Sequence, residues 1–191
     1  MTDDELVGLY SEGNSGAFDV LLDRYKEKLF SYISFIVRNR DVAEDIFQDT
    51  FVKAITTLRK GGYTSTGKFG AWLTRIAHNL IIDYFRQDRN ENTTSNDGLE
   101  TDLLNNASLC EQNIEDKIVS EQILGDVRRL LNMLPESQRE VVFMRFYQDL
   151  SFKEISEITG VSINTALGRM RYALINMRRI AAEKNIILSL D

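Results

Sequence analysis

The chain has 191 residues, of which 43% are hydrophobic and 27% charged, and this globular composition excludes wholesale disorder. A single cysteine, Cys110, excludes an internal disulfide, and a single histidine, His78, excludes a histidine-rich metal site. The net charge of −6 is concentrated in residues 91–126, which hold 1 basic and 9 acidic residues, whereas residues 127–191 carry a net charge of +3.

The beginning of the chain is acidic, where a signal peptide would be basic and then apolar. No run of the sequence reaches the roughly 18 apolar residues that a membrane span needs. We therefore expect a protein of the reducing cytoplasm that does not insert into a membrane itself. Apolar residues recur three and four apart through long segments, so the sequence predicts an all-α fold.

The first half of the chain predicts four helices, over residues 2–11, 16–38, 41–58 and 68–86. In the third of them, Asp41 is followed three residues later by Glu44. This spacing is that of a capping box, so we expect Asp41 to be the N-cap. The glycine-rich segment 61–67 predicts a loop before the fourth helix.

The second half predicts a linker and then further helices. Residues 87–113 are dominated by Asn, Ser, Thr, Asp and Glu, a composition typical of a flexible tether. Helical spacing returns over residues 114–132, and Pro135 suits the first turn of the next helix. The expected plan is two small helical domains, 1–88 and 114–191, joined by an acidic linker over residues 89–113.

Residues 151–162 have the pattern of two helices joined by a tight turn. Ser151 and Glu154 form a capping box, Gly160 permits a left-handed helix end, and Ser162 can cap the helix that follows. Helices joined by so short a turn cross at a steep angle. The pattern therefore predicts a helix-turn-helix whose second helix extends over residues 162–179.

The second helix of this motif divides into two sides. The apolar side, which we expect to be buried, consists of Ile163, Ala166, Leu167, Met170, Ala173, Leu174 and Met177. The polar residues near the start of such a helix meet base edges in duplex DNA, and arginines suit phosphates or guanine. The candidate duplex contacts, called the reading face below, are Lys153, Ser162, Asn164, Thr165, Arg169, Arg171 and Arg178. The alternative is an ordinary solvated helix face.

The predicted helix over residues 41–58 carries a second candidate surface, called the acidic face below. Its members are Asp41, Glu44, Asp45, Gln48, Asp49 and the apolar Val52. Charged helix faces are usually just solvated, whereas an apolar residue among the charges favours docking of a basic partner. The residues alone leave both interpretations open.

The predicted helix over residues 68–86 carries a third candidate surface, called the mixed edge below. It consists of Lys68, Trp72, Arg75, Asn79, Asp83 and Arg86. Aromatic and basic side chains on one surface suit single-stranded DNA, because bases stack on the rings and phosphates pair with the cations. Trp72 taken alone is more typical of a core. His78 has no nucleophile or ligand partner at a useful spacing, so we expect it to be exposed.

Three blocks of the sequence resemble bacterial RNA polymerase sigma factors. Residues 41–51 resemble the helix that binds core polymerase, and residues 69–86 resemble the helix that reads and melts the −10 element. Leu134 and Pro135 with Arg139, followed by residues 151–179, are similar to the domain that reads the −35 element. The resemblance covers about residues 14–88 and 115–180, and two such domains are typical of the extracytoplasmic-function class. Where the family's recognition helix often has a Lys-Ser pair, this chain has Leu167 and Gly168.

The resemblance implies a non-catalytic subunit, without cofactor or metal, that directs core RNA polymerase to promoter DNA. It implies that the acidic face binds polymerase, that the mixed edge holds unpaired −10 bases, and that the reading face contacts the −35 duplex. The acidic linker would occupy a basic channel built for RNA. The resemblance also implies control by an anti-sigma factor, which in this family is often membrane-anchored.

Two other classes of protein remain as alternatives. One is a helix-turn-helix regulator that binds duplex DNA without polymerase, and co-purification with core polymerase would separate the two interpretations. The other is an enzyme, which is least favoured because the sequence has no nucleophile–base pair, metal cluster or glycine-rich phosphate loop.

Overall fold

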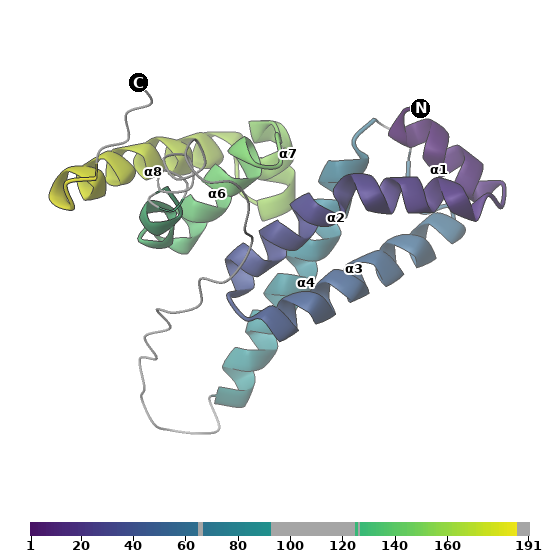
Figure 1. The fold of residues 1–191 in the computed structure, drawn as a ribbon, viewed down its shortest axis with the longest axis horizontal. Coiled ribbons are helices and arrows are strands. Elements are labelled where there is room, and N and C mark those ends of the chain that lie inside the picture. Colours follow the sequence, from purple (N-terminus) through teal and green to yellow (C-terminus); the bar gives the residue numbers. More distant parts are fainter. Residues whose placement is uncertain (65–66, 93–124, 126, 187–191) are drawn as a thin grey trace, which may run out of the picture.

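A computed structural model describes residues 1–64, 67–92, 125 and 127–186, and all regular elements within them are helices (Figure 1). The all-α prediction is therefore confirmed. Residues 127–132 are helical and precede α6. In chain order the elements are α1 (Asp3–Ser11), α2 (Ser15–Val37), α3 (Arg40–Arg59), α4 (Phe69–Asn92), α6 (Glu136–Phe146), α7 (Phe152–Thr159) and α8 (Ile163–Glu183).

The start of α3 differs from the prediction. Asn39 is the N-cap, and its side-chain oxygen accepts hydrogen bonds from the backbone N–H groups of Asp41 at 3.1 Å and Val42 at 3.3 Å. The expected capping box from Asp41 to Glu44 is wrong, because Asn39 is an equally good cap two residues earlier. Glu44 instead pairs with Arg40 at 2.9 Å, one turn back along the helix.

Two helices are longer than the sequence predicts. α4 continues through the expected domain end at residue 88 to Asn92, and this stretch contains no Gly or Pro that would end the helix. α8 continues past Arg179, which forms an ion pair with Glu183 at 2.7 Å. The remainder of the predicted linker, residues 93–113, and the start of the helix expected at residue 114 lie outside the described residues.

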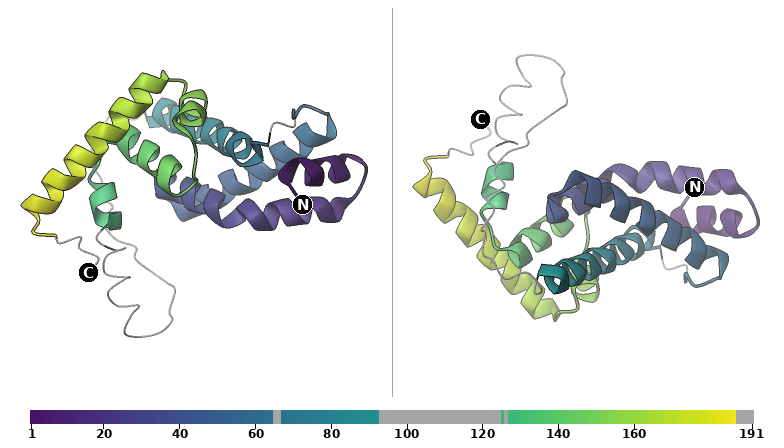
Figure 2. Two further views of the ribbon diagram at one scale, coloured as in Figure 1. Left: turned by 90° about the horizontal axis from the view of Figure 1, so that it is seen from above. Right: turned by 90° about the horizontal axis from the view of Figure 1, so that it is seen from below.

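The helices pack in two groups, and the buried residues of both groups belong to one continuous core. In the first group α1 lies on α2 and α3, and α2, α3 and α4 contact one another around buried Leu21, Ile33, Phe69 and Leu73. In the second group α6, α7 and α8 pack together around Val141, Met144, Ile155 and Ala166. Both ribbon views place α8 at the opposite end of the molecule from α1 (Figure 2).

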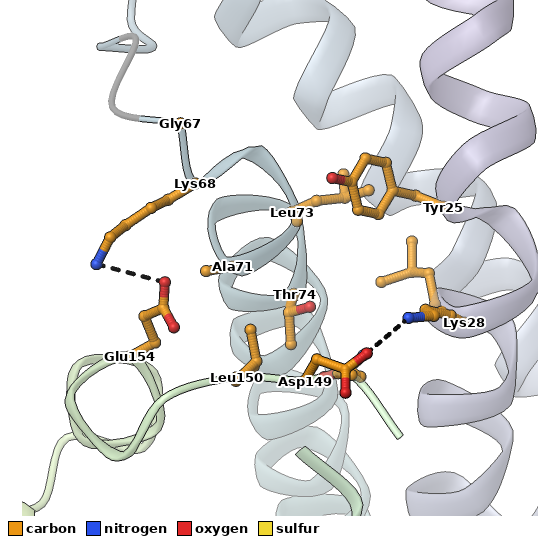
Figure 3. Close-up of a pocket in the computed structure, with 13 residues that line it drawn as sticks. Tyr25, Lys28, Gly67, Lys68, Ala71, Leu73, Thr74, Asp149, Leu150 and Glu154 are labelled. Carbon is orange, nitrogen blue, oxygen red and sulfur yellow. Dashed lines mark hydrogen bonds and ion pairs between the residues drawn. The ribbon is translucent and has the colours of Figure 1, made fainter. Parts of the chain in front are cut away.

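The two groups meet where α6 contacts α2 and where α7 contacts α4. The ring of Phe143 on α6 stacks on Phe35 of α2, with centroids 4.7 Å apart. A cavity of about 290 Å³ also lies between residues of the two groups, and two ion pairs bridge it. They are Lys28–Asp149 at 3.1 Å and Lys68–Glu154 at 3.3 Å (Figure 3).

His78 lies inside this junction, so the prediction that it is exposed is wrong. It is 8% exposed, and its Nδ1 atom is 2.8 Å from Glu140 Oε1 and 3.1 Å from the hydroxyl of Tyr32. That hydroxyl donates a hydrogen bond to Glu140 at 2.9 Å. Burial, and then the charge of Glu140, raise the pKa of Tyr32 well above its usual value, so the hydroxyl keeps its proton. Glu140, the charged partner of His78, lies beyond the linker in the sequence. Helical spacing around His78 gives no information about a partner so distant in the chain.

We expect replacement of this carboxylate to destabilise the protein. Glu140→Ala leaves the buried Tyr32 hydroxyl without its acceptor and removes one partner of His78, which should lower the free energy of unfolding by about 1–3 kcal/mol. Urea denaturation followed by circular dichroism measures the change. Glu140→Gln, which keeps an acceptor, should lower the free energy of unfolding by less. Glu157→Ala, at an exposed position of α7, should change it little. Equal stability of the Glu140→Ala and Glu157→Ala variants would contradict the role of this cluster.

Candidate nucleic-acid interface

The helix-turn-helix is built from three local signals that the sequence predicts. At the start of α7, Ser151 Oγ accepts from the backbone N–H of Glu154 at 3.3 Å, and the Glu154 carboxylate accepts from the backbone N–H of Ser151 at 2.8 Å. Gly160 ends α7 with φ +69°, in the left-handed region. Ser162 then begins α8 by accepting the N–H of Thr165 at 3.1 Å. The predicted capping box, left-handed helix end and second cap are all confirmed.

Glu154 also connects the helix-turn-helix to the first group of helices. Burial raises the pKa of its carboxyl, but hydrogen bonds from Ser151 and the charge and hydrogen bond of Lys68 outweigh burial, so the pKa is lowered. Glu154 is therefore ionised at neutral pH and pairs with Lys68, as Figure 3 shows. Lys68, a member of the mixed edge, therefore already has one acidic partner within the protein.

The buried side of α8 is narrower than the sequence predicts. Ala166, Met170 and Ala173 are buried, whereas Ile163, Leu167 and Leu174 are 45%, 43% and 40% exposed. The prediction that these three residues lie in the core is wrong. The described helices that cover α8 are α6 and the two-turn α7, and they are too small to bury the whole apolar stripe.

The reading face lies on the exposed part of the motif. Lys153, Ser162, Asn164, Thr165, Arg171 and Arg178 are exposed, and Arg169 is half-buried. Its three arginines, Arg169, Arg171 and Arg178, form no ion pair with any described residue. Cations without internal partners are available to neutralise phosphates, and the first turn of α8 adds the exposed polar residues Asn164 and Thr165.

The mixed edge follows the exposed side of α4. Arg75, Asn79, Asp83 and Arg86 are exposed, and Arg86 lies 3.6 Å from Asp83. Trp72 is half-buried, because its ring packs on Tyr63 at 4.8 Å and on Phe69 at 5.4 Å. Tyr63 is not among the predicted members of the mixed edge, although an aromatic residue in the loop before α4 is a signal that could have found its contact with Trp72.

The acidic face lies on α3, opposite the buried residues Ala43, Ile46, Phe51, Ala54 and Leu58. Asp41, Asp45, Gln48 and Asp49 are exposed, and Glu44 is partly exposed. Val52 is 62% exposed at the C-terminal end of this surface, one turn after Gln48 and Asp49. An exposed aliphatic side chain next to polar and acidic ones is a feature of protein interfaces, in which an apolar centre has a polar rim.

Neither a metal site nor a membrane-spanning helix is found among the described residues. No three of its His, Cys, Asp and Glu side chains come together as a metal site would require. None of its helices has the length and apolar character needed to span a bilayer.

Comparison with known proteins shows which family the chain is similar to. Residues 21–91 match the family Sigma-70 region 2, and residues 124–171 match Sigma-70, region 4. The chain is 30% identical over 173 residues to the ECF RNA polymerase sigma-E factor of Escherichia coli K12, with 89% of each protein covered. It is 33% identical over 158 residues to the ECF RNA polymerase sigma factor BldN of Streptomyces coelicolor, covering 82% of this chain and 57% of that protein.

The chain belongs to the extracytoplasmic-function sigma factors. It is thus a sigma factor that directs transcription initiation, and the alternative of a free-standing regulator is not favoured. The region 2 match includes the acidic face and the mixed edge, and the region 4 match includes the turn and the first half of α8.

Two solved structures share the fold of this one. The structure of CnrH in complex with the cytosolic domain of CnrY has a TM-score of 0.66 at 22% identity, covering 95% of this chain and 97% of that chain. The sigma factor RpoE in complex with the anti-sigma factor NepR from Bartonella quintana has a TM-score of 0.68 at 23% identity, covering 86% and 96%.

Proposed function

We propose that this sigma factor is a non-catalytic subunit that uses its three surfaces for three different partners. The acidic face binds core RNA polymerase, the mixed edge holds the melted −10 strand, and the reading face binds the −35 duplex. In this proposal residues 1–88 form the polymerase-binding and melting domain, which α4 extends to Asn92, and residues 114–191 form the −35-reading domain. The acidic linker over residues 89–113 lies in a basic channel of the polymerase.

The observation that carries the proposal is the state of the arginines on α8. Arg171 and Arg178 are exposed and have no ion-pair partner among the described residues, on a helix whose start is fixed by the Ser162 cap. A capped helix that presents free cations after a tight turn has the geometry of a recognition helix in a major groove. The charges give affinity for phosphates, and Asn164 and Thr165 face the positions where base edges lie.

The partners of the relatives extend the proposal to regulation. CnrH and the Bartonella RpoE were solved as complexes, and the partner of RpoE is an anti-sigma factor. We propose that an anti-sigma factor controls this chain as well. Such a factor is often membrane-anchored in this family, whereas the chain itself works in the cytoplasm.

Run-off transcription with purified core polymerase on a promoter library tests the main proposal. The chain should bind core polymerase and should add initiation at a defined set of promoters that core polymerase alone does not use. Binding to duplex DNA without any association with core polymerase would contradict the proposal and favour an independent regulator.

The arginines of the reading face give a first prediction. Arg169→Ala and Arg171→Ala should each weaken binding of the holoenzyme to the −35 duplex by about 1–3 kcal/mol if they contact bases. If they contact phosphate alone, each substitution should weaken binding to all DNA sequences equally and make the salt dependence of binding shallower. Arg179→Ala is the matched control, because it removes the same charge from the same helix at a residue paired with Glu183. Unchanged affinity in both test variants would contradict the assignment of the reading face.

A further inference from the structure

Two exposed aliphatic side chains stand at the start of α8, next to the polar residues of the reading face. Ile163 and Leu167 are 45% and 43% exposed, and Ile163 directly follows the Ser162 cap. They are four residues apart, so they lie on one side of the helix, about 6 Å apart along its axis. Asn164 and Thr165 lie between them in the sequence. An aliphatic patch therefore lies where a recognition helix meets bases.

Gly168, which directly follows this patch, has no role within the fold of the described residues. It lies inside α8, its backbone is not in the left-handed region, and a Cβ atom built on it would meet nothing within 4 Å. Glycine in the interior of a helix destabilises it relative to alanine. A remaining advantage of glycine is that another molecule can approach the helix backbone closely at this point.

The charges around the patch identify the kind of molecule that approaches. Exposed Arg171 and Arg178 lie on the same flank of α8, and the helix holds no acidic residue before Glu183. This surface is complementary to the phosphates of a nucleic-acid duplex. In the major groove thymine is the base that presents a methyl group, and aliphatic side chains recognise it by contact. Side chains of a helix lean toward its N-terminus, so Leu167 reaches over the first turn of α8.

We propose that Ile163 and Leu167 recognise C5-methyl groups of thymine in the −35 duplex, and that Gly168 lets the backbone of α8 approach the DNA beside them. The inference rests on the proposed function of the reading face and specifies the base that it reads. The third exposed aliphatic residue of the stripe, Leu174, lies seven residues after Leu167 and about 10 Å further along the axis. Leu174 lies outside the patch and serves as its control.

Replacement of thymine by deoxyuridine tests the inference, because it removes one methyl group and nothing else. The full chain with core polymerase first selects −35 duplexes from a randomised library. Its affinity is then measured for a selected duplex and for copies in which each thymine in turn is deoxyuridine. At one or two positions the wild type should bind the thymine duplex about four-fold more tightly, the factor that corresponds to burial of one methyl group.

The variants determine which residue reads the methyl group. Leu167→Ala should bind the thymine and deoxyuridine duplexes equally, whereas Leu174→Ala should discriminate as the wild type does. Tight binding of selected duplexes without any thymine preference would overturn the inference and leave the proposed function intact. Failure to select any −35 sequence would contradict the proposed function itself. Equal loss of discrimination in both variants would overturn the assignment to Leu167.

Gly168→Ala tests the close approach separately. In the free protein this variant should raise the melting temperature by about 2–4 °C, because alanine favours the helix. In the holoenzyme it should weaken binding to the selected −35 duplex at least three-fold, because the added methyl group stands between the helix and the DNA. Wild-type affinity in a variant with a raised melting temperature would overturn the proposed role of Gly168.

Discussion

Reversal of the charge at Asp45 and Asp49 should abolish binding of this sigma factor to core RNA polymerase. Both carboxylates are exposed on α3, on the same surface as Val52, and neither has an ion-pair partner among the described residues. If the acidic face docks on a basic surface, Asp45→Lys with Asp49→Lys places like charges opposite each other, which costs several kcal/mol at a protein interface. The fold should be unaffected, because exposed charges without partners contribute little to stability.

Size-exclusion chromatography with purified core polymerase measures the association, and a thermal melt followed by circular dichroism checks the fold. The matched control is Asp19→Lys with Glu27→Lys, which makes the same change of charge at exposed positions of α2. The control should bind polymerase, although its net charge equals that of the test variant. Wild-type association of the Asp45 and Asp49 variant would show that the acidic face is an ordinary solvated surface.

Local signals in the sequence predict most of the fold. The capping box of Ser151 and Glu154 and the left-handed end at Gly160 depend on neighbouring residues only, so both could be predicted without the rest of the structure. Asn39 shows the limit of such signals, because two good capping residues stand two positions apart and the sequence does not say which one the backbone uses.

The errors lie where contacts come from distant segments. His78 is buried because Glu140 and Tyr32 reach it from α6 and α2, and no periodicity within α4 reports a partner on another helix. Ile163 and Leu167 fit an apolar stripe, yet the size of α6 and α7 decides how much of the stripe is covered. The candidate surfaces could be predicted because helical spacing places their members together, whereas the extent of burial depends on packing.

Loss of the Asn79 amide should impair promoter opening and spare promoter binding. Asn79 and Arg75 are exposed one turn apart on α4, so both can contact one DNA strand. The amide offers a donor and an acceptor to a base edge, and the guanidinium can pair with phosphate or stack on a base. Packing of α4 against α2, α3 and α7 holds this edge in a fixed position. Extruded bases held there offset part of the few kcal/mol that unpairing and unstacking require.

The test compares a duplex promoter with the same promoter carrying a pre-melted bubble. Asn79→Ala should bind core polymerase and form the closed complex as the wild type does, but permanganate reactivity of unpaired thymines and run-off yield should fall about ten-fold on the duplex if base capture is worth about 1.4 kcal/mol. The bubble removes the energy needed for opening, so transcription from it should fall much less. Gln87→Ala, an exposed amide on the same helix and outside the mixed edge, should open the duplex normally. Equal loss on bubble and duplex, or normal opening by Asn79→Ala, would mean that this edge does not act by stabilising melted DNA.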